Sequence, residues 1–166
     1  MKKNSKVKKT AYVCGPLTEL PPEIQGSVKS FYEKIADVCF EVLGVRAFVP
    51  HEHFDPIKHA QATPQDVDYA ERKQVCENTS VLIVVAIAPS WGGGIEVEMA
   101  YRSKVPVVIL CEKEKLDQRK ISRLLRGNPG IYGRGAGIIS YDSQEFGLRA
   151  LSGILSLMQG SKRLKK

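Results

Sequence analysis

The sequence predicts an α/β protein with a doubly wound, parallel sheet of five strands and helices on both faces. Short apolar segments that suit strands alternate with longer segments of helical periodicity, an order typical of parallel sheets. The most apolar segment, Val81–Ala88, is rich in β-branched residues and too short to cross a membrane, as expected for a central strand. Glycine and proline mark the junctions, and ligands of such sheets bind beyond the carboxyl ends of the strands.

The first part of the chain predicts a strand, a loop and a long helix. Thr10–Cys14 is a short apolar strand, and a loop at 15–23 follows its carboxyl end. Apolar residues then recur at helical spacing as far as Leu43. Gly44 should end this helix, because glycine readily takes the left-handed conformation at a helix C-terminus.

A second strand and a polar loop come next. Val45–Pro50 is the predicted strand, and His51–Pro56 is a polar loop at the same edge of the sheet. The three histidines, at positions 51, 53 and 59, could supply metal ligands, yet no Cys or carboxylate stands at a typical ligand spacing. We therefore expect no metal and assign His51 to hydrogen bonding with a ligand.

The following helix carries candidate acids. Thr63 is its predicted N-cap, and the helix should run to about Asn78. Asp66, Asp68 and Glu71 are candidates for a second catalytic carboxylate, although a solvated helix face is the commoner role for any one of them.

The centre of the chain places a carboxylate beside a glycine-rich loop. After the strand Val81–Ala88, Pro89–Gly94 is a predicted loop whose three glycines allow positive φ and let a ligand approach bare backbone. An amphipathic helix is expected from Ile95, which puts Glu96 in its first turn. There the helix dipole should lower the pKa of the carboxyl group.

Two further side chains bear on the role of Glu96. Tyr12 lies near the carboxyl end of the first strand and could hold a carboxylate through its hydroxyl, although a core tyrosine is the simpler role. Glu98 lies on another face of the helix and four residues before Arg102, which favours a surface ion pair. The spacing therefore leaves Glu96 open between a catalytic carboxylate and a partner of the helix dipole without chemistry, and it favours a surface role for Glu98.

The last part of the chain completes the sheet. Two more apolar segments are predicted strands, and each precedes a segment of helical periodicity. In chain order these are the strand Pro106–Cys111, the charged helix Leu116–Leu125, the strand Gly137–Tyr141 and the amphipathic helix Phe146–Met158. Three loops, at 15–23, 50–62 and 89–95, should then converge at the ligand-binding edge.

Composition indicates one domain with two basic tails. The chain has 166 residues, 43% of them apolar, which is enough for an ordinary core. Nine of the 25 Lys and Arg lie in residues 1–9 and 161–166, which leaves 16 basic against 18 acidic residues between them. The net charge of +7 thus belongs to the tails, the first of which we expect to be disordered. We predict a single domain at 10–160 and no nucleic-acid partner.

The cysteines indicate a reducing compartment. Cys14, Cys39, Cys76 and Cys111 show no metal-finger or redox spacing, and each lies in or beside a predicted element. Buried free thiols are the expected state. Since the basic N-terminus lacks the apolar stretch of a signal peptide, we expect a cytoplasmic protein without a membrane partner.

Two segments carry a family resemblance. Tyr12–Leu17 (YVCGPL) and Pro89–Ala100 (PSWGGGIEVEMA) resemble, in sequence, order and separation, the nucleoside 2-deoxyribosyltransferase superfamily, which includes nucleoside 5′-monophosphate N-glycosidases. The first motif is weak by itself, but the pair is fairly specific, and the similarity covers roughly residues 10–155. It implies a Rossmann-like, five-stranded sheet and an enzyme without a cofactor. It also implies a small-molecule nucleoside or nucleotide partner and a homodimer or larger homo-oligomer.

The resemblance implies roles for particular residues. Glu96 falls on the nucleophile that attacks the anomeric carbon and displaces the base, and Tyr12 falls on the tyrosine that orients it. The family's general acid is commonly an Asp in the preceding helix, where the nearest residues are Glu71 and Arg72, with Asp68 one turn earlier. The remaining expected ligand contacts lie in or near the two motifs: Gly15, Pro16, Leu17, His51, Ser90, Gly92, Gly93 and Gly94.

Ser90 bears on the substrate. Family members that act on free nucleosides typically have Asp at this position to hold the 5′-hydroxyl, whereas the monophosphate glycosidases have Ser. A Ser hydroxyl and the N–H groups of Gly92–Gly94 at a helix N-terminus can donate to a phosphate, which an Asp would repel. Against this, the loop at 15–23 contains Glu19 and no Arg or Lys. We predict a hydrolase that cleaves the N-glycosidic bond of a nucleoside 5′-monophosphate.

Three other functions stay open. A nucleoside 2-deoxyribosyltransferase would pass the glycosyl group to a second base instead of water. A cytokinin-activating type phosphoribohydrolase has a similar glycine-rich loop and Glu, but its usual PGGxGTxxE pattern has a Thr that PSWGGGIEVE lacks. A non-catalytic nucleotide-binding sensor would keep the pocket without turnover.

Overall fold

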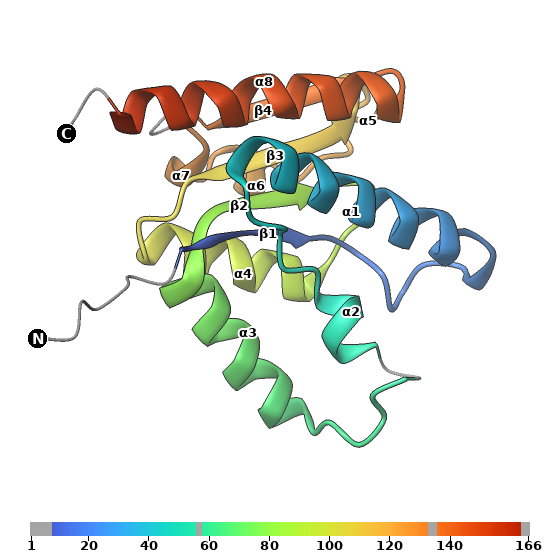
Figure 1. Cartoon of the computed structure of the whole chain (residues 1–166). Coiled ribbons are helices and arrows are strands. Elements are labelled where there is room, and N and C mark those ends of the chain that lie inside the picture. The colour runs from blue at the N-terminus through green and yellow to red at the C-terminus, as the bar shows by residue number, and fades with distance from the viewer. Residues whose placement is uncertain (1–7, 56–57, 133–135, 164–166) are drawn as a thin grey trace, which may run out of the picture.

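The computed structural model describes residues 8–55, 58–132 and 136–163. Four parallel strands form one sheet in the order β1-β2-β3-β4 (Figure 1). The strands are β1 (Thr10–Cys14), β2 (Thr79–Val85), β3 (Val107–Glu112) and β4 (Gly137–Tyr141). The predicted α/β class and parallel sheet are therefore confirmed.

Helices cover both faces of this sheet (Figure 1). In chain order they are α1 (Pro22–Leu43), α2 (Pro50–Phe54), α3 (Pro64–Asn78), α4 (Trp91–Arg102), α5 (Lys113–Asp117), α6 (Arg123–Arg126), α7 (Pro129–Tyr132) and α8 (Gln144–Arg163). Buried side chains of α1 and α8 pack on one face, and those of α3, α4 and α7 pack on the other. No helix in the described part of the chain is apolar over a length that could span a membrane.

Successive side chains of a strand point to opposite faces of the sheet. In β1, Ala11 and Val13 join the core under α1 and α8, whereas Tyr12 and Cys14 join the core under α4. A polar group on the inner face of α4 therefore meets Tyr12 and Cys14.

Two predicted helix ends are confirmed by their caps. Thr63 and Asp66 form a reciprocal capping box at the start of α3, with hydrogen bonds of 3.1 and 3.2 Å. Gly44 ends α1 with a φ of 65°, a left-handed conformation that favours glycine. Of the cysteines, which are all free, Cys76 is half-buried and the other three are buried.

The predicted strand Val45–Pro50 is not a strand of the sheet. Only Phe48 pairs with β1, as a single parallel bridge to Tyr12 with backbone hydrogen bonds of 2.8 and 2.9 Å. Pro50 has no N–H with which to continue a ladder, and it begins α2 instead. The described residues therefore form a sheet of four strands rather than five, and much of the predicted polar loop is a short helix.

Helix α4 begins four residues earlier than predicted, at Trp91. Ser90 is its N-cap and accepts a hydrogen bond from the Gly93 N–H at 3.1 Å. Gly92–Gly94 is thus helical, and none of these glycines has a positive φ. Glu96 lies in the second turn, beyond the N–H groups whose dipole was expected to lower its pKa.

Two other predicted boundaries differ. The helix expected at 116–125 is divided into α5 and α6, with Arg119 between them at a φ of 57°. Helix α8 continues to Arg163, so the start of the predicted C-terminal tail is helical. Lys8 and Lys9 are exposed and have no regular structure, whereas tail residues 1–7 and 164–166 lie outside the described residues.

Candidate active site

A cavity of about 920 Å³ lies at the carboxyl ends of β1 and β2. Segments 14–20, 50–64 and 88–96 contribute to its wall, so the three predicted loop regions do converge there. Most of the predicted site residues line it: Gly15, Pro16, Leu17, His51, Asp68, Glu71, Ser90, Gly92, Gly93 and Glu96. Tyr12 lies behind Glu96 rather than on the wall, and Gly94 lines a neighbouring cavity.

Glu96 is held by Tyr12. The Glu96 residue is only 7% exposed, and its Oε1 accepts a hydrogen bond from the Tyr12 hydroxyl. Tyr12 is fully buried, and Phe48 stacks on its ring with the centroids 5.3 Å apart. Burial and the neighbouring Glu96 carboxylate raise the pKa of Tyr12, so its hydroxyl stays protonated and keeps donating.

Burial raises the pKa of Glu96, whereas the sequence led us to expect a lowered value. Hydrogen bonds from Tyr12 and from the Cys14 thiol oppose this rise because they stabilise the carboxylate. The expectation was wrong because Glu96 points from the second turn of α4 into the core. Its surroundings are therefore set by β1 and not by the end of the helix.

Glu71 is the second carboxyl group of the cavity. Burial, followed by the charges of Glu96 and Asp68, raises the pKa of Glu71 to about 7. Asp68 also lines the cavity but is exposed, and it accepts a hydrogen bond from Arg72 at 2.8 Å. Asp66 serves in the cap of α3. Of the three candidate acids on this helix, Glu71 is the one with the surroundings of a proton donor near neutral pH.

The N-terminus of α4 forms another part of the wall. Ser90 already occupies two of the N–H groups expected to be free, because its Oγ accepts from Gly93 and its carbonyl from Gly94, each at 3.1 Å. Helix geometry leaves the N–H groups of Trp91 and Gly92 without an intrahelical acceptor. The Ser90 hydroxyl can still donate its proton. The donors offered to an anion are thus partly different from those predicted.

Gly15 lets the first loop pack closely against the sheet. A Cβ at this position would lie 2.4 Å from the Tyr32 Oη and 2.9 Å from the Val85 carbonyl oxygen. The Tyr32 hydroxyl donates to the Pro16 carbonyl at 2.6 Å and so fixes the loop that lines the cavity. Gly15 is therefore required for packing, whatever it contributes to a ligand.

A second cavity of about 800 Å³ adjoins the first across the start of α4. Trp91, which is 92% exposed, lines both cavities. The Lys115 ammonium lies in the second cavity's wall but is engaged, because it donates to the Ile87 carbonyl and pairs with Glu112 at 3.0 Å. Sequence reasoning did not find this cavity, because only one side of its wall belongs to the glycine-rich motif and the other side comes from residues 115–128, which carry no motif.

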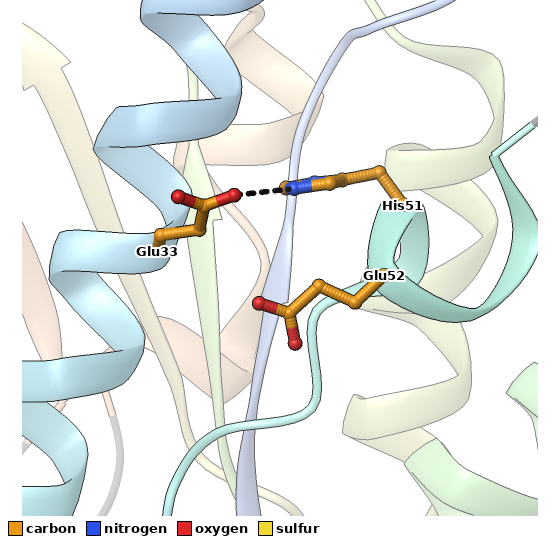
Figure 2. Close-up of side chains that lie close together, drawn as sticks. All are labelled: Glu33, His51 and Glu52. Carbon is orange, nitrogen blue, oxygen red and sulfur yellow. Dashed lines mark hydrogen bonds and ion pairs between the residues drawn. The ribbon is translucent and has the colours of Figure 1, made fainter.

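Glu33, His51 and Glu52 come together beside the first cavity. Figure 2 shows Glu33 of α1 facing His51 and Glu52 of α2, and their ligand-type atoms lie within 4.8 Å of one another. The Glu52 carboxylate, however, accepts a hydrogen bond from Arg46 at 2.6 Å. Because that cation would repel a metal ion, the geometry favours a histidine–carboxylate pair over a metal centre.

The other two histidines have different surroundings. His53 stacks on Phe48, with the ring centroids 4.3 Å apart, and does not line the cavity. His59 does line it, although no sequence signal distinguished it. Glu33 was also missed, because its position on α1 carries no pattern that predicts contact with a residue eighteen positions away.

The arrangement can support acid and nucleophile chemistry in one cavity. Glu96 has two donors that stabilise its carboxylate, whereas no hydrogen bond within the described residues lowers the pKa of Glu71. Two carboxyl groups whose surroundings differ in this way suit different roles, one ionised and the other protonated.

Comparison with known proteins shows the fold alone. No family model and no curated protein matches the chain. Among solved structures, that of BlsM in solution has a TM-score of 0.61 at 16% identity, over 96% of this chain and 95% of that one. The crystal structure of a conserved protein from Enterococcus faecalis V583 has a TM-score of 0.56 at 20% identity, over 88% of this chain and 98% of that one.

Proposed function

We propose that this chain cleaves the N-glycosidic bond of a nucleoside 5′-monophosphate, as a hydrolase of the nucleoside 2-deoxyribosyltransferase type. The observation that carries the proposal is the buried Glu96, held by Tyr12 in a cavity that also contains Glu71. The proposal includes a Rossmann-like winding, in which the segment around Phe48 lies beside β1 and pairs with it through a single bridge.

Glu96 acts as the nucleophile in this proposal. Its carboxylate attacks C1′ of the sugar, and the electron pair of the C1′–N bond leaves with the base. The Glu71 carboxyl group gives its proton to the departing base. Water then attacks C1′ of the glycosyl-enzyme and gives a proton to the Glu71 carboxylate. The sugar phosphate leaves, and the Glu96 carboxylate and the Glu71 acid are restored.

The surroundings of the two acids support this division of roles. Tyr12 and Cys14 donate to the Glu96 carboxylate and favour its ionised form. The Glu96 charge in turn raises the pKa of Glu71, which favours the protonated form of that acid near pH 7. Asp68 is less suited to be the acid, because its carboxylate is exposed and already accepts hydrogen bonds from Arg72.

The N-terminus of α4 supports the choice of a monophosphate. The Ser90 hydroxyl and the backbone N–H groups of Trp91 and Gly92 are donors at the positive end of the helix dipole. Gly92 has open space where a Cβ would stand, so an anion can approach its backbone. No basic side chain of the loop at 15–23 assists, so backbone and hydroxyl donors carry the recognition in this proposal.

Release of free base tests the proposal. The protein is incubated with ribo- and deoxyribonucleosides and with their 5′-monophosphates, and the base and sugar phosphate are separated by chromatography. We expect base release from a monophosphate and much less from the matching nucleoside. Adding a second base distinguishes transfer from hydrolysis, and binding without release from any substrate would contradict catalysis. Light scattering tests the homo-oligomer that the resemblance implies.

A further inference from the structure

His51 has a polar atom without a partner at the cavity. Its side chain is 8% exposed and lines the cavity, and its Nδ1 is buried with no hydrogen-bond partner within the described residues. The other ring nitrogen, Nε2, lies 3.4 Å from Oε1 of Glu33 (Figure 2). A buried polar atom without a partner is unusual in a folded protein, which indicates that a ligand supplies what the chain does not.

The contact with Glu33 decides which ring nitrogen carries the proton. An ionised carboxylate can only accept, so a neutral His51 places its proton on Nε2 and donates to Glu33. Nδ1 then bears a lone pair and acts as an acceptor. Glu52 does not compete for the ring, because its carboxylate is paired with Arg46 at 2.6 Å. The His51 ring, which lines the cavity, therefore carries a buried hydrogen-bond acceptor without a partner in the described residues.

The chain around His51 is firmly anchored. Asp55, one residue beyond the end of α2, is 3% exposed and pairs with Lys29 of α1 at 2.5 Å. The Asp55 carbonyl also accepts from the His59 N–H at 2.8 Å. These contacts fix α2 against α1, so the direction of the His51 ring is set before a ligand binds.

The strand order decides which part of a substrate meets His51. Phe48 pairs with one side of β1, and β2, which leads into α4, pairs with the other. Glu96 is bonded to Tyr12 of β1. The cavity therefore runs from the N-terminus of α4, past Glu96, to His51. With the phosphate at α4 and C1′ at Glu96, as the proposed function has it, the base lies toward His51.

We infer that His51, oriented by Glu33, accepts a hydrogen bond from an amino group of the leaving base. This inference rests on the proposed function. It makes His51 a specificity residue that favours amino-bearing bases, such as adenine and cytosine, over their oxo counterparts, hypoxanthine and uracil. An oxo group would bring a second acceptor against Nδ1 and leave both without a proton to share.

Matched substrate pairs test the inference. We expect kcat/KM to favour adenosine over inosine monophosphate, or cytidine over uridine monophosphate, by about tenfold or more in whichever pair is cleaved. In His51→Ala the ratio should fall to within about threefold, mainly through loss on the amino substrate. Glu33→Ala, at a half-exposed position that is safe for folding, should lower the ratio in the same direction. Glu52→Gln is the control and should leave it unchanged.

Measurements of substrate binding test the inference independently of catalysis. Calorimetric Kd values for the same monophosphates with Glu96→Gln should show the same amino preference, and that preference should shrink when His51→Ala is added. If no substrate is cleaved but the binding preference holds, the proposed function fails and the inference stands. The inference would be overturned if the wild-type chain preferred neither base or preferred the oxo base. It would also be overturned if the ratio of amino to oxo substrate stayed unchanged in both His51→Ala and Glu33→Ala.

Discussion

Glu71 and Glu96 line the same cavity, and their neighbours decide which of them holds a proton. Burial raises the pKa of both groups, but at Glu96 hydrogen bonds from Tyr12 and Cys14 oppose the rise, whereas at Glu71 the charges of Glu96 and Asp68 add to it and bring the pKa to about 7. Among the three candidate acids that the sequence did not separate, Glu71 is therefore the one whose surroundings suit the role.

Glu71→Gln should change stability in a pH-dependent way. The pKa of Glu71 rises from its ordinary 4.5 to about 7 on folding, so between these pH values the folded chain holds a proton that the unfolded chain releases. This group's contribution to stability therefore falls as pH rises through that window. The variant should gain a few degrees in Tm over wild type at pH 8 and little or nothing at pH 5. The same variant should lose base release.

Asp68→Asn is the matched control for Glu71. It changes a carboxylate on the same helix and the same cavity wall, but one that is exposed and paired with Arg72. Unlike Glu71→Gln, Asp68→Asn should show no gain in Tm over wild type that increases from pH 5 to pH 8. An equal change for Glu71→Gln at pH 5 and pH 8 would show that Glu71 titrates normally and is not the acid.

In the proposed function, helix α4 supplies both the nucleophile and the donors for the substrate's phosphate. Its N-cap, Ser90, fixes where the helix begins, and from there Glu96 reaches Tyr12 in the second turn. The element thus sets the spacing between the anion-binding N-terminus and the reacting carboxylate. A change at Ser90 can alter either the cap or the phosphate site, and the choice of substitution separates the two.

Ser90→Asp should weaken monophosphate hydrolysis more than nucleoside hydrolysis. Asp is as good an N-cap as Ser, so α4 should keep its start, while the added negative charge repels a phosphate of charge near −2. We expect kcat/KM for the monophosphate to fall at least about tenfold more than that for the nucleoside. Ser90→Asn, a neutral cap of the same shape, should spare the monophosphate. Equal losses of kcat/KM on both substrates in Ser90→Asp would show that the phosphate does not bind at this site.

Local sequence signals predicted the elements well where the structure depends on neighbours in the chain. The capping box at Thr63 and the left-handed Gly44 are of this kind. Gly92–Gly94 was assigned to a loop because three consecutive glycines allow positive φ, yet the Ser90 cap starts α4 at Trp91 and the glycines are helical. The segment at 45–50 has the composition of a strand, but Pro50 ends it after one bridge.

The candidate site was predictable only in part, because much of it depends on burial and on contacts between residues far apart in the chain. Tyr12 and Glu96 could be paired through the two motifs, and the structure brings them together. The raised pKa of Glu96 and the choice of Glu71 over Asp68 depend on burial, which spacing does not reveal. The contact between Glu33 and His51 joins α1 to α2 and left no local signal.

The charge of the whole molecule is concentrated near its two ends. The chain between residues 10 and 160 has 16 basic and 18 acidic residues, whereas the net charge of the full chain is +7. The cavity lies at the carboxyl ends of the central strands, and none of the described residues of the two terminal segments lines it. The fold and the site should therefore be independent of the terminal lysines.

A chain limited to residues 10–160 tests this. It keeps Leu155 and Met158, the buried residues of α8 nearest the C-terminus. We expect the circular dichroism spectrum to be unchanged and substrate Kd to stay within about twofold of that of the full chain. Much weaker substrate binding by a folded, truncated chain would assign the basic ends a part in recognition.

Base release by Glu96→Gln, measured beside Glu98→Gln, tests the central claim most directly. Both changes remove one negative charge from α4, but Glu96 is buried against Tyr12 and Glu98 pairs with Arg102 at 2.8 Å on the exposed face. We expect Glu96→Gln to fold normally and lose about 10³-fold or more in kcat, because the amide keeps the shape without the nucleophile. Glu98→Gln should stay within about twofold of wild type. Activity of Glu96→Gln within a few-fold of wild type, or equal losses in the two variants, would contradict the assignment of Glu96 as the nucleophile.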